Sequence, residues 1–340
     1  MNFSDSLTKL IENKDLSLKE MQDLMQKIMT GQLTDAQIAA SLIALRMKGE
    51  SVEELTAAAS VMRSLSDRVQ LSDNNLIDIV GTGGDGQNTF NISTTTCFVV
   101  AACGGTIAKH GNRSVSSKSG SADVLELAGV NINLSAQQVA QCIEACNIGF
   151  MFAPAHHKAM KHAINVRKEL GVRTVFNLLG PLTNPANANT HIIGVFAKKW
   201  LMPMAQTLVN LGCDNLMVIH SQDGLDEISI SAPTDIIYFC QGKFTQRTIE
   251  PKEFNCFHDN MNAIKVDSAE QSLAMMLEVL SAKPGPAYDI VALNAAAAIF
   301  CAQLSDSFSN ALMLAKQALD SGAAAEKLKQ LIKYSHQVKH

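Results

Sequence analysis

The sequence predicts an α/β protein in which a small all-helical domain precedes a larger domain built on a mostly parallel sheet. Residues 1 to about 66 contain short amphipathic segments with repeated helix-start signals. From Leu76 onward, apolar runs alternate with helical segments, which is the pattern of a parallel sheet covered by helices. The 340 residues also exceed the usual size of one hydrophobic core. We therefore expect a helical domain over 1–70 and an α/β domain over 71–340.

Three capping boxes mark helix starts in the first domain. They are Ser17–Glu20, Thr34–Gln37 and Ser51–Glu54, in which the first and fourth residues satisfy each other's free backbone N–H groups. Gly31 and Gly49 stand where helices commonly end. Nothing in this block carries evident chemistry, so we expect a helical bundle that packs against the second domain or pairs subunits.

The second domain is expected to alternate strands and helices. The expected strands are Leu76–Val80, Thr106–Ala108, Ile148–Phe152, His191–Phe196, Leu216–His220 and Ile236–Cys240. The expected helical segments are Ser135–Cys146, Lys158–Leu170, Trp200–Leu211, Ala269–Leu280, Ala287–Leu304 and Ser307–Ser335. Ligands of such sheets bind beyond the carboxyl ends of the strands, so residues that follow strands are the candidates for a site.

Composition argues against several classes of protein. A net charge of −4 is unlike that of a general nucleic-acid binder, which is normally basic. No run reaches about 18 consecutive apolar residues, and no apolar stretch follows the start of the chain, so we expect neither a membrane span nor a signal peptide. The eight cysteines are scattered through apolar segments without a CxxC motif. We therefore expect reduced cysteines and a cytoplasmic location.

The first chemically distinctive stretch follows the strand expected at Leu76–Val80. It reads GTGGDG over Gly81–Gly86 and then TFNIST over Thr89–Thr94. Glycine lets the backbone approach a ligand closely, and the polar turn leads into an apolar helical segment whose first N–H groups face the same place. The spacing does not fit the dinucleotide or Walker patterns. A tight turn without a ligand is the alternative, and we favour a phosphate-binding turn.

A second polar turn follows the strand expected at Thr106–Ala108. It reads KHGNR over Lys109–Arg113 and continues into a run of five serines: Ser114, Ser116, Ser117, Ser119 and Ser121. A lysine offers a point charge to phosphate oxygens and an arginine offers a planar fork. The alternative is a solvated basic turn, and Ser121 also fits the N-cap of the helix that follows. We favour a turn in which Lys109 and Arg113 reach a common polyanion.

Two further groups remain open on residue type alone. Asp226 and Glu227 follow the strand expected at Leu216–His220 and could hold Mg²⁺ together with substrate oxygens, or could lie in a solvated loop. His157 and Arg167 are expected to share a face of one helical segment, because ten residues are close to three turns. Arg167 could meet a substrate carboxylate or lie on the helix surface. A zinc site is not expected, because no HExxH pattern is present.

Taken together, these motifs resemble the anthranilate phosphoribosyltransferase family. The resemblance rests on GTGGDG, TFNIST, the Lys109–Asp123 stretch, Gly171–Pro185 and Asp223–Ser229, in that order along the chain. It implies transfer of the phosphoribosyl group of phosphoribosyl pyrophosphate (PRPP) to anthranilate in tryptophan biosynthesis, with Mg²⁺. It also implies a nucleoside phosphorylase/phosphoribosyltransferase-like fold, in which part of 171–190 joins the helical domain. A homodimer through that domain is implied as well.

The resemblance further implies which residues bind each ligand. For PRPP they are Gly81, Gly84, Asp85, Thr89, Asn91, Ile92, Ser93, Thr94, Lys109, His110, Gly111, Asn112, Arg113, Ser114, Val115, Ser116, Ser117 and Ser121. For anthranilate they are Gly81, Asn112, His157 and Arg167, and for Mg²⁺ they are Ser93, Asp226 and Glu227. No residue is assigned as a catalytic general base, although His110 is the nearest candidate by position. Lys158 departs from the family's motif, which usually has proline there.

Two other functions stay open beside this one. A pyrimidine nucleoside phosphorylase-like enzyme would share the architecture but would bind one inorganic phosphate. A nucleic-acid-binding relative would need a basic face and would not need intact substrate motifs. The small molecules anthranilate and PRPP are therefore the expected partners, and neither nucleic acid nor a membrane is expected.

Overall fold

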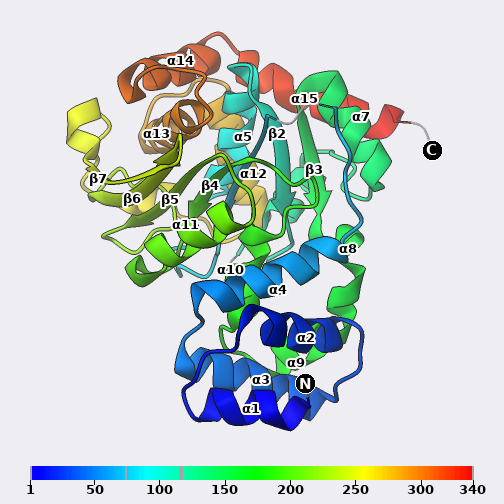
Figure 1. The fold of residues 1–340 in the computed structure, drawn as a ribbon. Helices are drawn as coiled ribbons and strands as arrows, with labels where there is room; N and C mark the ends of the chain where they lie inside the picture. The colour runs from blue at the N-terminus through cyan, green and yellow to red at the C-terminus, as the bar shows by residue number, and fades with distance from the viewer. Residues whose placement is uncertain (1, 73–74, 115–117, 339–340) are drawn as a thin grey trace.

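The computed structural model describes residues 2–72, 75–114 and 118–338. Figure 1 shows a small helical unit, in blue, below a larger α/β unit. The predicted fold class is confirmed, because the larger unit contains a seven-stranded sheet with helices packed on it. In the described part of the chain, no helix is long and apolar enough to cross a membrane.

The helical unit begins with four helices: α1 (Phe3–Ile11), α2 (Leu18–Met29), α3 (Asp35–Lys48) and α4 (Val52–Ser64). Two predicted capping boxes form in full, because the hydroxyls of Thr34 and Ser51 accept from the fourth residue's N–H while their own N–H groups donate to its side chain. At the third box, the Ser17 N–H donates to Glu20. Buried Glu54 also accepts from the Leu16 N–H, which ties the start of α2 to α4.

A later segment packs into the same unit. It follows α8 (Ala153–His156) and comprises the 3₁₀ helix η1 (Lys158–His162), α9 (Ile164–Leu170), α10 (Val175–Leu179) and η2 (Gly180–Leu182). Val166 and Phe176 share one buried apolar cluster with Leu42 and Leu55 of the first helices. The same cluster continues onto one face of the sheet. Residues far apart in sequence therefore build the wall between the two units.

The sheet has the order β3-β2-β1-β4-β5-β6-β7. Its strands are β1 (Leu76–Gly81), β2 (Thr106–Gly111), β3 (Ile148–Phe152), β4 (Thr190–Gly194), β5 (Asn215–Ser221), β6 (Thr234–Cys240) and β7 (Lys243–Ile249). The first five strands run parallel, whereas β6 and β7 add to β5 as an antiparallel edge. The prediction missed β7, because its residues are mostly polar and exposed and give no apolar run.

Helices cover both faces of the sheet. On one face lie α5 (Ile92–Ala102), α6 (Ser121–Leu127), α7 (Ala136–Cys146), α12 (Ala269–Leu280), α13 (Pro286–Cys301), α14 (Phe308–Asp320) and α15 (Ala323–Gln337), and on the other lies α11 (Leu201–Asn210). Met217 and Ile219 of β5 face the first cluster while Leu216 and Val218 face the second. This alternation follows from the two-residue repeat of a strand, and it fixes which side chains reach each layer.

One predicted helix is wrong. Lys158–Leu170 was expected to be one helical segment that includes His157, but η1 ends at His162 and α9 begins at Ile164. His157 itself has non-helical dihedrals, with φ −113° and ψ 58°. Its ring Nε2 lies 2.9 Å from the Thr183 carbonyl, a partner so distant in sequence that local periodicity could not reveal it. His157 and Arg167 therefore do not lie on one continuous helix.

Candidate active site

The loops that follow β1 and β5 are joined by hydrogen bonds. The Gly83 N–H donates to Asp226 Oδ2 at 3.0 Å, and Gln87 Nε2 donates to the Asp223 carbonyl at 3.0 Å. Two strand-end glycines permit this approach: a Cβ at Gly81 would collide with the Asp226 carboxylate, and a Cβ at Gly194 would collide with the Asp226 carbonyl. The glycine turn and the acidic loop thus form one structure at the carboxyl edge of the sheet.

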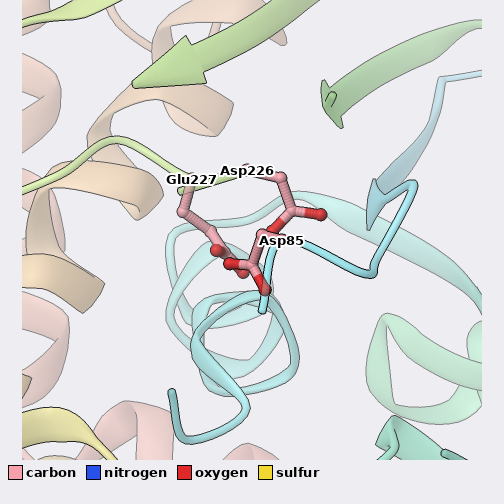
Figure 2. Close-up of side chains that lie close together, drawn as sticks. All are labelled: Asp85, Asp226 and Glu227. Carbon is pink, nitrogen blue, oxygen red and sulfur yellow. The ribbon is translucent and has the colours of Figure 1, made fainter. Parts of the chain in front are cut away.

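Three carboxylates gather at this junction. Figure 2 shows Asp85 from the glycine turn beside Asp226 and Glu227, and one oxygen from each lies within 4.8 Å of the others. Burial, followed by the charge of Asp226, raises the pKa of Asp85 to about 6. Burial, followed by the charges of Asp226 and Asp85, raises the pKa of Glu227 well above its usual value. Such mutual repulsion is relieved when a cation binds between the acids.

The chemistry of these side chains fits a hard divalent cation. Carboxylate oxygens are the ligands that Mg²⁺ prefers, and Mg²⁺ is usually held by one or two of them plus substrate oxygens. Glu227 Oε2 is buried and has no hydrogen-bond partner among the described residues, as expected for an oxygen directed at an ion. Ser93, the third predicted ligand, lies in the first turn of α5. Within the described chain it makes no hydrogen bond to the three acids.

Asn91 connects the first turn to the second. Its Oδ1 accepts from the hydroxyls of Ser119 at 2.7 Å and Ser272 at 2.6 Å, and its Nδ2 donates to the Ser119 carbonyl at 3.3 Å. These bonds link the start of α5 with the chain after β2 and with α12. Because the Asn91 side chain is used in this way, it does not cap α5. The positive end of the α5 dipole is therefore not covered by its own N-cap side chain.

The second turn separates its two cations. Lys109 is buried and donates to the Ile79 carbonyl of β1 at 2.8 Å. Arg113 is exposed and pairs with Asp123 at 3.1 Å and Glu126 at 2.8 Å. The expectation that Lys109 and Arg113 reach a common ligand therefore stays a prediction, since Lys109 bonds the β1 backbone and Arg113 is ion-paired at the surface.

Other described residues of the second turn are placed by local contacts. Asn112 is exposed and accepts from the Arg113 N–H at 2.8 Å. Gly111 is packed so closely on Ser121 that a Cβ would collide with its hydroxyl. The N-cap alternative for Ser121 is wrong, because Gly120 caps α6 and the Asp123 carboxylate accepts from the Gly120 N–H. The other predicted residues here are Ser114, which donates its N–H to Asp123, and Val115, Ser116 and Ser117, which lie outside the described residues.

The other predicted PRPP residues lie along the first turn and the start of α5. Gly84 has a left-handed backbone with φ 74°. Thr89 forms an isolated antiparallel bridge with Lys265. Ile92 and Thr94 are buried in the first turn of α5. The structure thus brings this part of the predicted set together at one end of the sheet.

His110 and His157 meet at the wall between the two units. Their ring centroids are 5.1 Å apart, and the His157 ring bonds the Thr183 carbonyl. Burial lowers the pKa of His157 to about 4 and lowers the pKa of His110 well below its usual value. Both imidazoles are therefore neutral near pH 7, so they can act as polar walls without adding charge.

Arg167 is half-buried and lies against an aromatic ring, with no acidic partner in the described part of the chain. Its guanidinium lies 5.2 Å from the centre of the Phe176 ring. Burial alone lowers its pKa. No carboxylate of the described residues lies within ion-pair distance. A buried charge without a partner is costly, so this arrangement suits an anionic ligand.

Two residues of the site have roles that sequence reasoning missed. Asp85 was predicted to bind PRPP, and the structure also groups it with Asp226 and Glu227, the acids predicted to hold Mg²⁺. Gly194 was placed inside an expected strand with no role, although it makes room for the Asp226 backbone. A glycine at the end of an apolar run could have indicated such a close backbone approach. The grouping of Asp85 had no local signal, because its neighbours are 141 and 142 positions away.

Known proteins match the whole chain. A family model described as "Glycosyl transferase family, a/b domain" matches residues 73–325, and one described as "Glycosyl transferase family, helical bundle domain" matches 4–66. The chain is 52% identical over 335 residues to the "Anthranilate phosphoribosyltransferase" of Thioalkalivibrio sulfidiphilus, which covers 98% of this chain and 99% of that protein. The chain belongs to the anthranilate phosphoribosyltransferase family. It is thus an enzyme of the kind that its motifs predicted.

Other members of the anthranilate phosphoribosyltransferase family agree in sequence and structure. The Legionella pneumophila protein is 54% identical over 315 residues, covering 93% of this chain and 91% of its own. The Thermus thermophilus structure matches with a TM-score of 0.92 and 38% identity, covering 98% of this chain and 99% of that one. A Saccharomyces cerevisiae structure in complex with PRPP and Mg matches with a TM-score of 0.91 and 27% identity, covering 99% and 98%.

Proposed function

We propose that this chain transfers the phosphoribosyl group of PRPP to the amine of anthranilate, in tryptophan biosynthesis. The products are N-(5-phosphoribosyl)anthranilate and pyrophosphate. The observation that carries the proposal is the cluster of Asp85, Asp226 and Glu227 held against the glycine turn by the Gly83–Asp226 bond. The relatives' names and the yeast complex with PRPP and Mg support it. The reaction forms a bond from the anthranilate nitrogen to ribose C1 as the bond from C1 to pyrophosphate breaks.

Mg²⁺ is the cofactor of the proposed reaction. Asp226 and Glu227 would hold it, with the predicted Ser93 and with Asp85 beside them, because the three acids repel one another without a cation. When bound, Mg²⁺ would stabilise the negative charge that develops on the diphosphate leaving group.

The two polar turns would hold the diphosphate and the ribose phosphate. The contacts would come from the predicted PRPP residues, which are Gly81, Gly84, Asp85, Thr89, Asn91, Ile92, Ser93, Thr94, Lys109, His110, Gly111, Asn112, Arg113, Ser114, Val115, Ser116, Ser117 and Ser121. The N-terminal end of α5, which its N-cap side chain does not cover, would attract an anion, and buried Lys109 would add a positive charge. Such prepositioned donors stabilise the leaving group more strongly than water does, since they need no reorientation.

Anthranilate would lie against the opposite wall. Arg167 would bind its carboxylate, since this guanidinium has no acidic partner among the described residues. Neutral His157, together with Gly81 and Asn112, would complete that subsite. The amine of anthranilate is already unprotonated at neutral pH, so no general base is assigned. Orientation of the two reactants can then account for much of the rate, about 7–11 kcal/mol in well-oriented systems.

The organisation of the chain is also part of the proposal. We assign 1–70 and part of 171–190 to a helical domain and 71–340 to the PRPP-binding domain. Exposed Ile11 and Met47, 70% and 82% accessible, support a homodimer through the helical domain. Closure between the domains would exclude water that otherwise hydrolyses the activated ribose. We place the enzyme in the cytoplasm, consistent with eight unpaired cysteines.

The two other functions are not favoured. A nucleoside phosphorylase-like site needs to bind one phosphate, and three clustered acids would repel it in the absence of a metal. A nucleic-acid-binding relative would need a basic face, and the chain carries a net charge of −4.

A fluorescence assay tests the proposal directly. Purified protein mixed with anthranilate, PRPP and Mg²⁺ should consume the fluorescence of anthranilate, and omission of PRPP should abolish the change. A parallel reaction contains a pyrimidine nucleoside and inorganic phosphate. Turnover of the nucleoside, with no loss of anthranilate fluorescence, would overturn the assignment.

A further inference from the structure

Arg173 lies where three separate parts of the molecule meet. It belongs to the short segment between α9 and α10, which no motif reasoning assigned to a ligand. Its Nη2 donates to the carbonyl of Gly84 in the glycine turn. Its guanidinium also stacks 4.4 Å from the centre of the Phe196 ring, just beyond β4. One side chain thus contacts both the glycine turn and the loop beside it.

Other contacts hold Arg173 and Phe196 in these positions. Arg46 of α3 donates its Nη1 to the Arg173 backbone carbonyl, which connects Arg173 to the first four helices. The Phe196 N–H donates to Thr82 Oγ1 at 3.0 Å, which connects the ring to the start of the glycine turn. Arg173 therefore bridges the helical unit and the carboxyl edge of the sheet through contacts that restrict both its ends.

The carbonyl that accepts from Arg173 belongs to Gly84, the residue before Asp85. Gly84 adopts a left-handed backbone with φ 74°, and the peptide that carries this carbonyl also carries the N–H of Asp85. A fixed carbonyl therefore fixes the direction in which the Asp85 peptide points. Arg173 thus fixes the shape of the turn through its hydrogen bond to the Gly84 carbonyl.

We propose that Arg173 is a positioning residue that holds the glycine turn in the shape that binds the diphosphate of PRPP. This inference rests on the proposed function and adds a residue to it. Arg173 acts through Gly84 and Asp85 and does not contact the reacting atoms. Its effect is therefore specific to the ribosyl donor. Arg167, six positions earlier in α9, is instead assigned to the anthranilate carboxylate.

Steady-state kinetics of Arg173→Ala tests this division. The KM for PRPP should rise about tenfold, the size expected when one charge-assisted hydrogen bond is lost. The KM for anthranilate should stay within about twofold, as expected for a site that is not contacted. Arg173→Lys should recover part of the loss, because lysine keeps the charge near Asp85 but lacks the planar fork. Arg247→Ala, on the exposed edge strand β7, is the matched control and should behave as the wild type.

Binding of inorganic pyrophosphate with Mg²⁺, followed by calorimetry, gives a readout that is independent of turnover. Affinity should fall in Arg173→Ala by a similar factor and partly return in Arg173→Lys. Equal increases in both KM values, or an unchanged pyrophosphate affinity, would overturn the inference. If the alanine variant does not fold, Arg173→Lys alone must show the PRPP-specific change. The proposed function fails separately, if wild-type protein does not consume anthranilate.

Discussion

Two turns at the same edge of the sheet differ in how their charged side chains are balanced: one gathers acids without ion pairs within the described chain, and the other pairs its arginine with acids. The turn after β1 places Asp85 against Asp226 and Glu227, and no Lys or Arg of the described residues lies within ion-pair distance of these acids. The turn after β2 neutralises its exposed Arg113 with Asp123 and Glu126. The strands that lead into these turns are direct neighbours.

This difference indicates that the acidic cluster after β1 is suited to bind a cation, whereas the ion pairs of Arg113 after β2 have a structural role. An unbalanced cluster raises the pKa values of its own acids and gains free energy when a cation arrives. In the described part of the second turn, the charge of Arg113 is already balanced by its ion pairs, and Ser119 donates to Asn91. We therefore expect changes in the acidic cluster to alter metal dependence, and changes in the Arg113 ion pairs to alter little.

Removal of both loop acids should have the largest effect. Asp226→Ala combined with Glu227→Ala should lower turnover by at least about 100-fold, since electrostatic stabilisation of a leaving group is commonly of this size. The residual rate should require more Mg²⁺. Initial rates measured across a Mg²⁺ titration provide the test, with Glu253→Ala as an exposed acidic control. A Mg²⁺ titration that keeps its wild-type midpoint would reject the ligand assignment.

Two glycine substitutions should rank the contacts that support Asp226. A Cβ at Gly194 would overlap the backbone carbonyl of Asp226, whereas a Cβ at Gly81 would meet the end of its side chain, which can move. Gly194→Ala should therefore lower activity and the unfolding temperature more than Gly81→Ala does. Thermal unfolding of Gly180→Ala is the control, because its Cβ would meet no atom within 4 Å. The reverse ranking would show that the Asp226 backbone is not held as described.

Arg167→Ala should test the cation that lacks an acidic partner. The KM for anthranilate should rise at least tenfold, corresponding to about 1.4 kcal/mol or more. The KM for PRPP should change by less than about twofold, since the clamp contacts only the acceptor. Steady-state kinetics with each substrate varied in turn makes the measurement. Equal changes in both KM values would count against a carboxylate clamp.

Asp85→Asn should show how much the repulsion among the three acids lowers the free energy of unfolding. Because the pKa of Asp85 is raised to about 6 in the folded state, the folded state binds its proton more tightly than the unfolded state does. Its ionisation therefore destabilises the fold as pH rises from about 4 to about 6. At pH 7.5 without Mg²⁺, the variant should be more stable than the wild type, by at most about 3 kcal/mol. Near pH 4 the difference should vanish.

Thermal unfolding at these two pH values measures this effect. Asparagine keeps an oxygen that can accept the Gln87 N–H, so that hydrogen bond is not the variable. A variant that is less stable than the wild type at pH 7.5 would show that the three acids do not repel one another.

Glu126→Gln should have the smallest effect of the series. It removes one exposed partner of Arg113 while Asp123 remains in place, and exposed ion pairs contribute little to stability. The unfolding temperature should match the wild type, and the KM for PRPP should change less than about threefold. A loss of PRPP binding comparable to that of the acid variants would show that the second turn depends on its ion pairs.

Local patterns predicted much of the fold. Apolar runs found every strand of the parallel part, because these strands are buried on both faces. Helix-start signals found α2, α3 and α4, since capping depends on residues three apart. Glycine and serine motifs found the two turns because their chemistry is contiguous in sequence. β7 was missed because an exposed polar edge strand leaves no apolar run.

Features that depend on distant contacts could not be read in this way. His157 leaves the helical path because its ring bonds Thr183. Asp85 lies beside Asp226 and Glu227 because the sheet brings β1 beside β4 and β4 beside β5. The contact of Arg173 with Gly84 likewise spans 89 positions. Each of these contacts joins residues that the fold brings together from distant parts of the sequence, so residue spacing could not predict it.

Anomalous diffraction with Mn²⁺ and pyrophosphate tests the central claim most directly. Crystals of the protein soaked with both should show a Mn²⁺ peak at coordination distance from a carboxylate oxygen of Asp226 or Glu227. The pyrophosphate should lie between that ion and the glycine turn. A Mn²⁺ peak distant from Asp85, Asp226 and Glu227 would contradict the account.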